Sequence, residues 1–147
     1  MSTENIAEGR TKHTLAYGDC DVVGIAYFAI YYRWMESCYS RWLYANGIRG
    51  GEMVQDLGAV TVGVSSGCEY LQTVKVFDEL TCQAVREHIG NSSYRIGFEF
   101  TRDDELVTIG QMTFVARQPD FSKGSIPDRL REVLMTLPEP QQLRTNN

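Results

Sequence analysis

Two carboxylates stand close together near the start of the chain, directly before a run of aromatic residues. Asp19 and Asp21 precede Gly24 in the segment "GDCDVVGIAYFAIYYRW", residues 18–34. A carboxylate beside an apolar pocket can act as a nucleophile or as a general base. Asp is also a favoured N-cap residue, which accepts backbone N–H groups that the first helical turn leaves unpaired. The residue types alone leave both interpretations open for Asp21.

A long helix is predicted directly after this segment, from Tyr27 to Ala45. Its polar residues recur at intervals of three and four and share one narrow face, whereas the other positions are mostly apolar. The polar face consists of Arg33, Glu36, Ser37, Ser40 and Arg41. Asn46 and Gly47 form the expected C-terminal stop. Such a helix has to be covered on most sides, so we expect it at the centre of the fold.

Strand patterns surround the predicted helix. A short extended segment, residues 11–17, precedes the aspartates, and strand-like alternation runs from about Val60 to Gln118 after one predicted helical turn at residues 52–57. Turn-forming residues at 88–93 and 102–105 predict two hairpins. The last three long strands should therefore form an antiparallel meander.

Three smaller predictions concern the last strand, the C-terminal segment and the two ends of the chain. Apolar residues in the last strand change parity, which predicts a β-bulge near Gly110. A short helix is predicted at residues 127–137, and residues 1–10 and 138–147 are expected to be flexible. The element order is strand, long helix and then antiparallel strands, so we predict a single α+β domain, residues 1–147, with the sheet curled around one central helix.

Composition excludes several classes of protein. With 147 residues and a net charge of −5, the chain has the size of one domain and lacks the clustered Lys and Arg of a nucleic-acid-binding protein. No apolar run approaches the roughly 20 residues that cross a bilayer, and the first residues resemble neither a secretory signal nor a transit peptide. We expect neither a membrane nor a nucleic-acid partner, and a cytoplasmic location.

The cysteine and histidine residues do not form a metal or redox motif. The four cysteines are too far apart for a C-x-x-C pattern, so free and mostly buried thiols are expected. The two histidines, His13 and His88, lie in predicted strands without a nucleophile pattern beside them. We assign both a structural role and expect no metal and no cofactor.

The segment "GDCDVVGIAYFAIYYRWMES", residues 18–37, resembles the signature of the hotdog-fold 4-hydroxybenzoyl-CoA thioesterase family. In that family an Asp-x-x-Gly segment precedes the long helix, and a Tyr-rich stretch leads to Arg-Trp-Met. The resemblance covers this stretch closely, and it also covers the order of elements in nearly the whole chain. It implies a hotdog fold and hydrolysis of an acyl- or aroyl-CoA thioester.

The same resemblance implies particular site residues. Asp21 falls on the catalytic carboxylate, and Gly24 on the family's glycine. The backbone N–H of Phe28, with that of Tyr27 beside it, is expected to face the thioester carbonyl oxygen, because a helix N-terminus stabilises an oxygen that becomes negative. Tyr31 is expected to contact the substrate. Asp21 would either attack the thioester carbon or activate a water molecule.

Three further expectations concern residues around this motif. We expect Asp19 to brace the turn, and Glu36 to be a solvated or interface residue rather than a base. The resemblance places Ser93 at the substrate, and the basic residues nearest this hairpin, Arg95 with Arg86 and Lys123, are expected to bind CoA phosphates. Family members often carry basic residues just before this serine, where the present chain has Gly90, Asn91 and Ser92.

The identity of the substrate and the partner stay open at this point. An acyl-carrier thioester is the alternative to acyl-CoA, and a noncatalytic acyl-CoA-binding module is an alternative to an enzyme. A hotdog dehydratase is less favoured, because that chemistry generally uses an Asp and His pair and no His stands beside the motif. The resemblance also implies a homo-oligomer, dimer or tetramer, with sites at subunit contacts.

Overall fold

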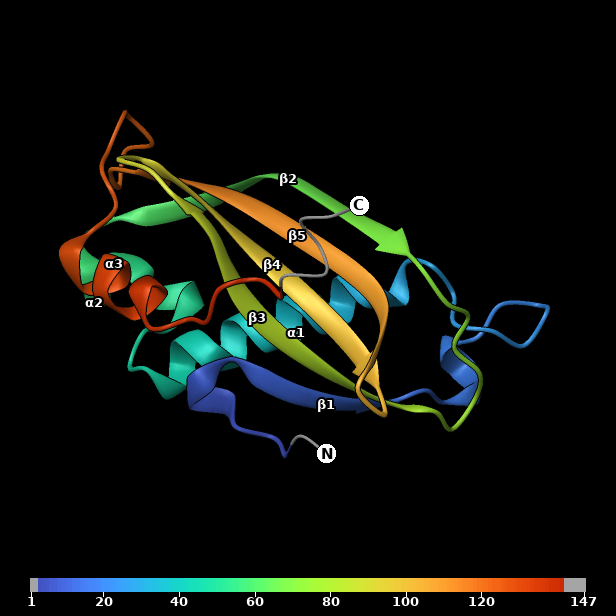
Figure 1. Ribbon diagram of the computed structural model, residues 1–147. Coiled ribbons are helices and arrows are strands. Elements are labelled where there is room, and N and C mark those ends of the chain that lie inside the picture. Colours follow the sequence, from blue (N-terminus) through green and yellow to red (C-terminus); the bar gives the residue numbers. More distant parts are fainter. Residues whose placement is uncertain (1–2, 142–147) are drawn as a thin grey trace.

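The computed structural model describes residues 3–141 and contains one five-stranded antiparallel sheet that curls around a central helix (Figure 1). The strands are β1 (Arg10–Thr14), β2 (Val60–Tyr70), β3 (Glu79–Ile89), β4 (Ser93–Arg102) and β5 (Glu105–Arg117). The α-helices are α1 (Ile30–Ala45), α2 (Met53–Leu57) and α3 (Asp128–Met135). Short 3-10 helices lie at Ile6–Glu8, Tyr17–Asp19 and Gly50–Glu52. The strand order is β1-β3-β4-β5-β2, which confirms the α+β prediction.

Helix α1 forms the core together with the concave face of the sheet. Its apolar positions are buried, as the spacing predicted: Tyr31, Trp34, Met35, Cys38, Tyr39, Trp42 and Leu43. Gly110 on β5 allows close approach, because a Cβ there would overlap the sulfur of Met35. The helix ends at Ala45 with Asn46 as its C-cap, and Gly47 follows with a φ of +82°, also as predicted.

The hairpin between β4 and β5 is a two-residue turn. Asp103 and Asp104 have φ values of +50° and +68°, the left-handed conformation at both positions that a type I′ turn requires. The β3–β4 hairpin also lies where the turn formers predicted it, between Ile89 and Ser93. The meander prediction is therefore confirmed.

The bulge that was predicted near Gly110 lies at Val107 instead. Gly110 pairs regularly with Phe98 on β4, whereas the register shifts between Phe100 and Thr101, where Val107 has no opposite partner. Val107 is fully buried, so the extra residue turns an apolar side chain inward at this point. The parity change in β5 therefore arises three residues earlier than predicted.

Helix α1 also begins three residues later than predicted. The backbone N–H of Tyr27 donates to the carbonyl of Asp19 at 2.8 Å, and the N–H of Ile30 donates to the carbonyl of Tyr27 at 2.9 Å. Residues 27–29 therefore form a turn ahead of the helix. The apolar sequence pattern of the helix continues through this turn, but the regular hydrogen bonds of the helix begin only after it.

His13 has the structural role that was expected. Its ring stacks on Trp34 with centroids 5.2 Å apart, and its Nε2 lies 2.9 Å from the hydroxyl of Thr11. Burial, with a smaller contribution from Arg41, lowers the pKa of His13 to about 4. The imidazole is therefore neutral at physiological pH.

The four cysteines are free thiols. Cys38 and Cys82 are buried, as expected, whereas Cys20 and Cys68 are only partly covered. Within residues 3–141, no helix is long and apolar enough to cross a membrane. Of the ends that were expected to be flexible, residues 1–2 and 142–147 lie outside the described residues, while Asn5 and Arg10 form a β-bridge.

Candidate functional site

A tight loop between β1 and α1 carries the sequence motif. Cys20 and Ala26 form an antiparallel bridge, and the N–H of Asp21 donates to the carbonyl of Ile25 at 2.9 Å. Gly24 closes the loop with a φ of +83°, which side chains rarely tolerate, so its role in the structure is conformational. A second bridge, Ile25 to Lys75, attaches the loop to the segment before β3. The motif therefore folds as a small hairpin at one end of the sheet.

Asp21 does not cap helix α1. One of its carboxylate oxygens, Oδ1, accepts the N–H of Val23 at 2.9 Å within the loop. The other oxygen, Oδ2, has no hydrogen-bond donor in the described part of the chain, and the residue is half-buried. The N-cap position of α1 belongs to Ala29, eight residues later. Asp21 is thus held by one oxygen and presents the other, which a nucleophile or base requires.

Asp19 braces the turn, as expected. Its Oδ2 accepts the N–H of Ala16 at 2.9 Å, and its backbone carbonyl accepts the N–H of Tyr27. The two neighbouring aspartates therefore differ in the backbone contacts that they make. Each carboxylate keeps one oxygen, Oδ1 of Asp19 and Oδ2 of Asp21, without a partner in residues 3–141, but only the backbone carbonyl of Asp19 bonds the turn that precedes α1.

The turn that precedes α1 offers free hydrogen-bond donors. Ala29 supplies no side-chain cap, and neither the N–H of Phe28 nor that of Ala29 donates to an acceptor among the described residues. Helix N-termini carry partial positive charge, so these donors favour a developing oxyanion. The N–H of Tyr27, which was expected to share this role, is already bonded to Asp19. The structure therefore removes Tyr27 from the set of free donors.

Aromatic side chains surround this helix start. Tyr31 is 2% exposed and packs edge-on against Phe100, with ring centroids 5.1 Å apart. Burial raises the pKa of Tyr31. Tyr31 is therefore a core residue of the single chain. Because its side chain is buried there, its expected contact with the substrate stays a prediction. Phe28 is 58% exposed, so the donor turn lies at the surface.

A residue that the sequence analysis missed holds this turn. The hydroxyl of Tyr70, at the end of β2, donates to the carbonyl of Phe28 at 3.0 Å. The two residues are 42 positions apart, so no local pattern points to the contact. The one available signal is strand parity, which places Tyr70 on the same face of β2 as Cys68 and hence toward the helix.

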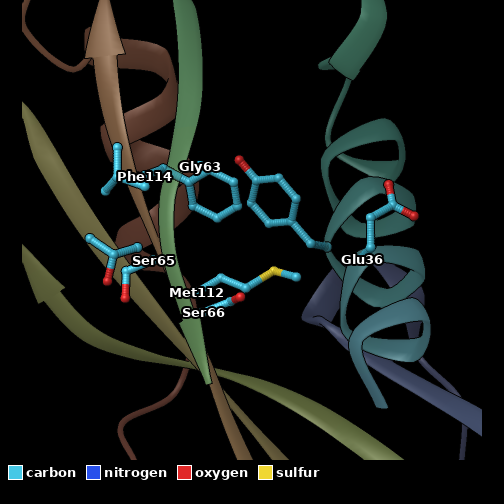
Figure 2. Close-up of a pocket in the computed structure, with 9 residues that line it drawn as sticks. Glu36, Gly63, Ser65, Ser66, Met112 and Phe114 are labelled. Atoms are coloured by element: carbon cyan, nitrogen blue, oxygen red, sulfur yellow. The ribbon is translucent and has the colours of Figure 1, made fainter. Parts of the chain in front are cut away.

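A groove of about 570 Å³ lies between α1 and the edge strand β2 (Figure 2). Its floor is aromatic, because Tyr39 stacks on Phe114 with centroids 4.6 Å apart. Small residues on β2 leave the space open: Gly63, Ser65 and Ser66. Figure 2 shows Glu36 on the helix, across from these strand residues. An apolar floor with few polar groups suits an acyl or aryl chain, and the exposed Glu36 stays at its border.

Ser93 and Arg95 lie at the other end of the sheet. The Asp21 loop adjoins the segment before β3, whereas Ser93 follows the end of β3. Eleven residues of β3 separate these ends, which corresponds to about 34 Å at the usual strand rise. Arg95 is exposed and bonds the Thr113 hydroxyl at 3.1 Å. One chain therefore does not bring these two predicted residues to Asp21.

A second, more polar pocket of about 450 Å³ adjoins the β3–β4 turn. Asn91 and Ser92 line it, together with two cations, Arg117 and Lys123. Neither cation has an ion pair within residues 3–141, and the lining contains no acidic side chain. The β3–β4 turn itself carries no basic residue, but Arg117 at the end of β5 and Lys123 in the following loop place positive charge beside it.

Comparisons with known proteins agree with this fold. The model of the Thioesterase superfamily matches residues 23–109. A 1,4-dihydroxy-2-naphthoyl-CoA hydrolase from Prochlorococcus marinus subsp. pastoris is 22% identical over 141 residues, which cover 92% of this chain and 91% of that protein. Among solved structures, a 1,4-dihydroxy-2-naphthoyl-CoA thioesterase from Synechocystis has a TM-score of 0.77 at 15% identity, covering 89% of this chain and 98% of that one.

A further solved structure was determined with CoA. It is a Staphylococcus aureus protein, with a TM-score of 0.77 at 14% identity, covering 91% of this chain and 90% of that one. The family match spans more than half of the present sequence. The chain therefore belongs to the Thioesterase superfamily, and its fold is the hotdog fold that the sequence predicted.

Proposed function

We propose that this chain hydrolyses an acyl- or aroyl-CoA thioester to the free acid and CoA. The observation that carries the proposal is the pairing of a half-buried carboxylate, Asp21, with the free N–H of Phe28 at the start of α1. Both belong to the short segment between β1 and α1, which the Cys20–Ala26 bridge folds back on itself. Two named relatives act on a naphthoyl-CoA ester, which supports an aroyl-CoA substrate.

In this proposal the thioester carbonyl oxygen accepts the N–H of Phe28, where the helix N-terminus stabilises the negative charge that forms. Asp21 can attack the carbonyl carbon directly, which forms an acyl-enzyme anhydride that water then hydrolyses. It can instead take a proton from water, whose hydroxide attacks the carbon. The CoA thiolate leaves in both routes. A thiolate is a good leaving group, so no strong acid is needed.

CoA is preferred over an acyl-carrier protein because of the charges on the chain. The two cations of the polar pocket, Arg117 and Lys123, can form charge-assisted hydrogen bonds with the nucleotide phosphates. A carrier protein is acidic and binds best to a broad basic surface, whereas this chain has a net charge of −5, which repels an acidic partner. The contact of Ser93 and Arg95 with the same end of CoA stays a prediction.

The site is proposed to be shared between two copies of the chain. The phosphate pocket and Asp21 lie farther apart in one chain than an extended pantetheine arm reaches, since a full strand separates them. Strand β2 is an open edge with exposed Val62 and Val64. Antiparallel pairing of two β2 edges would place Tyr70 of one copy near Val60 of the other, and so near that copy's β3–β4 turn.

A panel of thioesters tests the proposed function. Free thiol release should be measured for acyl-CoA, the matching acyl-pantetheine and the same acyl group on a carrier protein. We expect the CoA ester to be the best substrate and the pantetheine ester to be poorer mainly through KM, because it lacks the phosphates. Equal hydrolysis of CoA and pantetheine esters would favour the carrier protein, and binding without turnover would favour a noncatalytic module. The cytoplasm remains the predicted location.

A further inference from the structure

The turn before α1 is anchored by an acceptor rather than by its donors. A helix start is usually fixed by a side-chain cap that consumes one of the free N–H groups. Here Ala29 cannot provide one. The Phe28 carbonyl instead accepts the Tyr70 hydroxyl, which leaves the N–H groups of Phe28 and Ala29 available. This arrangement fixes the turn without occupying the donors that an oxyanion needs.

Because the peptide unit is planar, the hydrogen bond from Tyr70 to the Phe28 carbonyl also fixes the direction of the Ala29 N–H. The Phe28 carbonyl and the Ala29 N–H belong to one planar peptide unit and point in opposite directions. The preceding unit, which carries the Phe28 N–H, is held by the 2.9 Å bond from Ile30 to the Tyr27 carbonyl. Tyr70 thus holds one of two consecutive units, and the helix itself holds the other.

The phenol of Tyr70 is held by its neighbours, although the residue is 45% exposed. Its ring packs against that of Tyr31, with centroids 5.5 Å apart. Burial, with the neighbouring Cys68 and Tyr32, raises the pKa of Tyr70 to about 12. The hydroxyl is therefore protonated at neutral pH and can donate to the Phe28 carbonyl, as the 3.0 Å contact shows.

We propose that Tyr70 is a positioning residue for thioester hydrolysis, because its hydroxyl fixes the backbone turn that carries the oxyanion donors. This inference rests on the proposed function of Asp21 and Phe28. Tyr70 has no part in proton transfer and does not touch the substrate. It acts on the rate through the direction of the Phe28 and Ala29 N–H groups, which have to face the carbonyl oxygen within a few tenths of an ångström.

The test replaces Tyr70 with Phe, which keeps the ring and its packing and removes only the hydroxyl. Tyr70→Phe should lower kcat between about tenfold and a hundredfold, with little change in KM, because the donors matter more in the transition state than in substrate binding. The pH dependence of kcat should keep its shape, since no titrating group is lost. Tyr44→Phe, at an exposed tyrosine near the far end of α1, is the matched control and should behave like the unaltered protein.

An infrared measurement separates positioning from loss of structure. In the slow Asp21→Asn background, the carbonyl stretch of an isotope-labelled bound acyl-CoA should lie below its frequency in water, because the donors polarise the bond. Adding Tyr70→Phe should move that stretch back toward the frequency in water while the thermal midpoint stays within a few degrees. An unchanged stretch, or equal loss of kcat and thermal stability, would overturn the inference.

The result also separates this inference from the proposed function. If the unaltered protein releases thiol and Asp21→Asn does not, but Tyr70→Phe keeps a normal kcat, only the role of Tyr70 is wrong. If the unaltered protein hydrolyses no thioester in the panel, the proposed function fails, and the role of Tyr70 in it fails with it.

Discussion

A mixed oligomer can show whether each site is built from two chains. One variant, Asp21→Asn, lacks the reacting carboxylate, and a second carries Arg117→Ala with Lys123→Ala. If a site combines Asp21 of one copy with the cations of another, random exchange of equal amounts leaves about one quarter of all sites with both parts intact. The roughly 34 Å between the two regions in one chain is the reason to expect this.

The assay is thiol release at an acyl-CoA concentration well below KM. Each variant alone should be at least about tenfold slower than the unaltered protein, since removing the charge-assisted phosphate contacts raises KM and removing Asp21 lowers kcat. After exchange the mixture should recover about 25% of the unaltered kcat/KM. A rate that stays at the average of the two separate variants would refute the shared site, because every single-chain site would then carry one defect.

Four further predictions follow from the same structure. Gly110→Ala should lower the free energy of unfolding by about 1–3 kcal/mol in urea denaturation, because the added methyl group meets Met35. Because the pKa of His13 is about 4 in the folded chain and 6.5 in the unfolded chain, the unfolded chain binds a proton first as the pH falls, and the free energy of unfolding should decrease. The decrease from pH 7 to pH 5 is about 2 kcal/mol and should be smaller in His13→Gln, as urea denaturation at the two pH values would show. Arg95→Ala should raise KM for acyl-CoA and leave kcat nearly unchanged in steady-state kinetics, and normal KM would remove Arg95 from the site. Light scattering at micromolar concentration should show a dimer or larger, because β2 is an open edge, and a monomer would contradict the shared site.

The sequence predicted the elements well, because its periodicities are strong. The buried face of α1 and both hairpin turns lie where spacing and turn formers placed them. The predicted start of α1 was three residues too early, because the apolar pattern continues through residues 27–29. In the structure, the hydrogen bond from the Tyr27 N–H to the Asp19 carbonyl holds these residues in a separate turn. The position of the bulge was wrong by three residues, because the parity of apolar residues shows that the register changes but not at which residue.

The site was predictable only in part. Asp21 and Phe28 belong to one local motif, so a single stretch of sequence identifies both. Tyr70 reaches Phe28 only after the sheet has curled around α1, and a contact across 42 positions leaves no local signal. The positive charge near the β3–β4 turn was predicted in part: Lys123 was expected there and lines the pocket, whereas Arg117 was missed because it comes from the end of β5.

The most direct test of the account compares Asp21→Asn with Asp19→Asn in the release of thiol from an aroyl-CoA. The amide side chain of the Asp21→Asn variant keeps an oxygen for the Val23 N–H, so the loop should survive and the thermal midpoint should hardly change. We predict that hydrolysis by Asp21→Asn falls by at least about 10²-fold, while Asp19→Asn mainly alters stability. A near-normal rate for Asp21→Asn, or a larger kinetic loss for Asp19→Asn, would contradict the central role of Asp21.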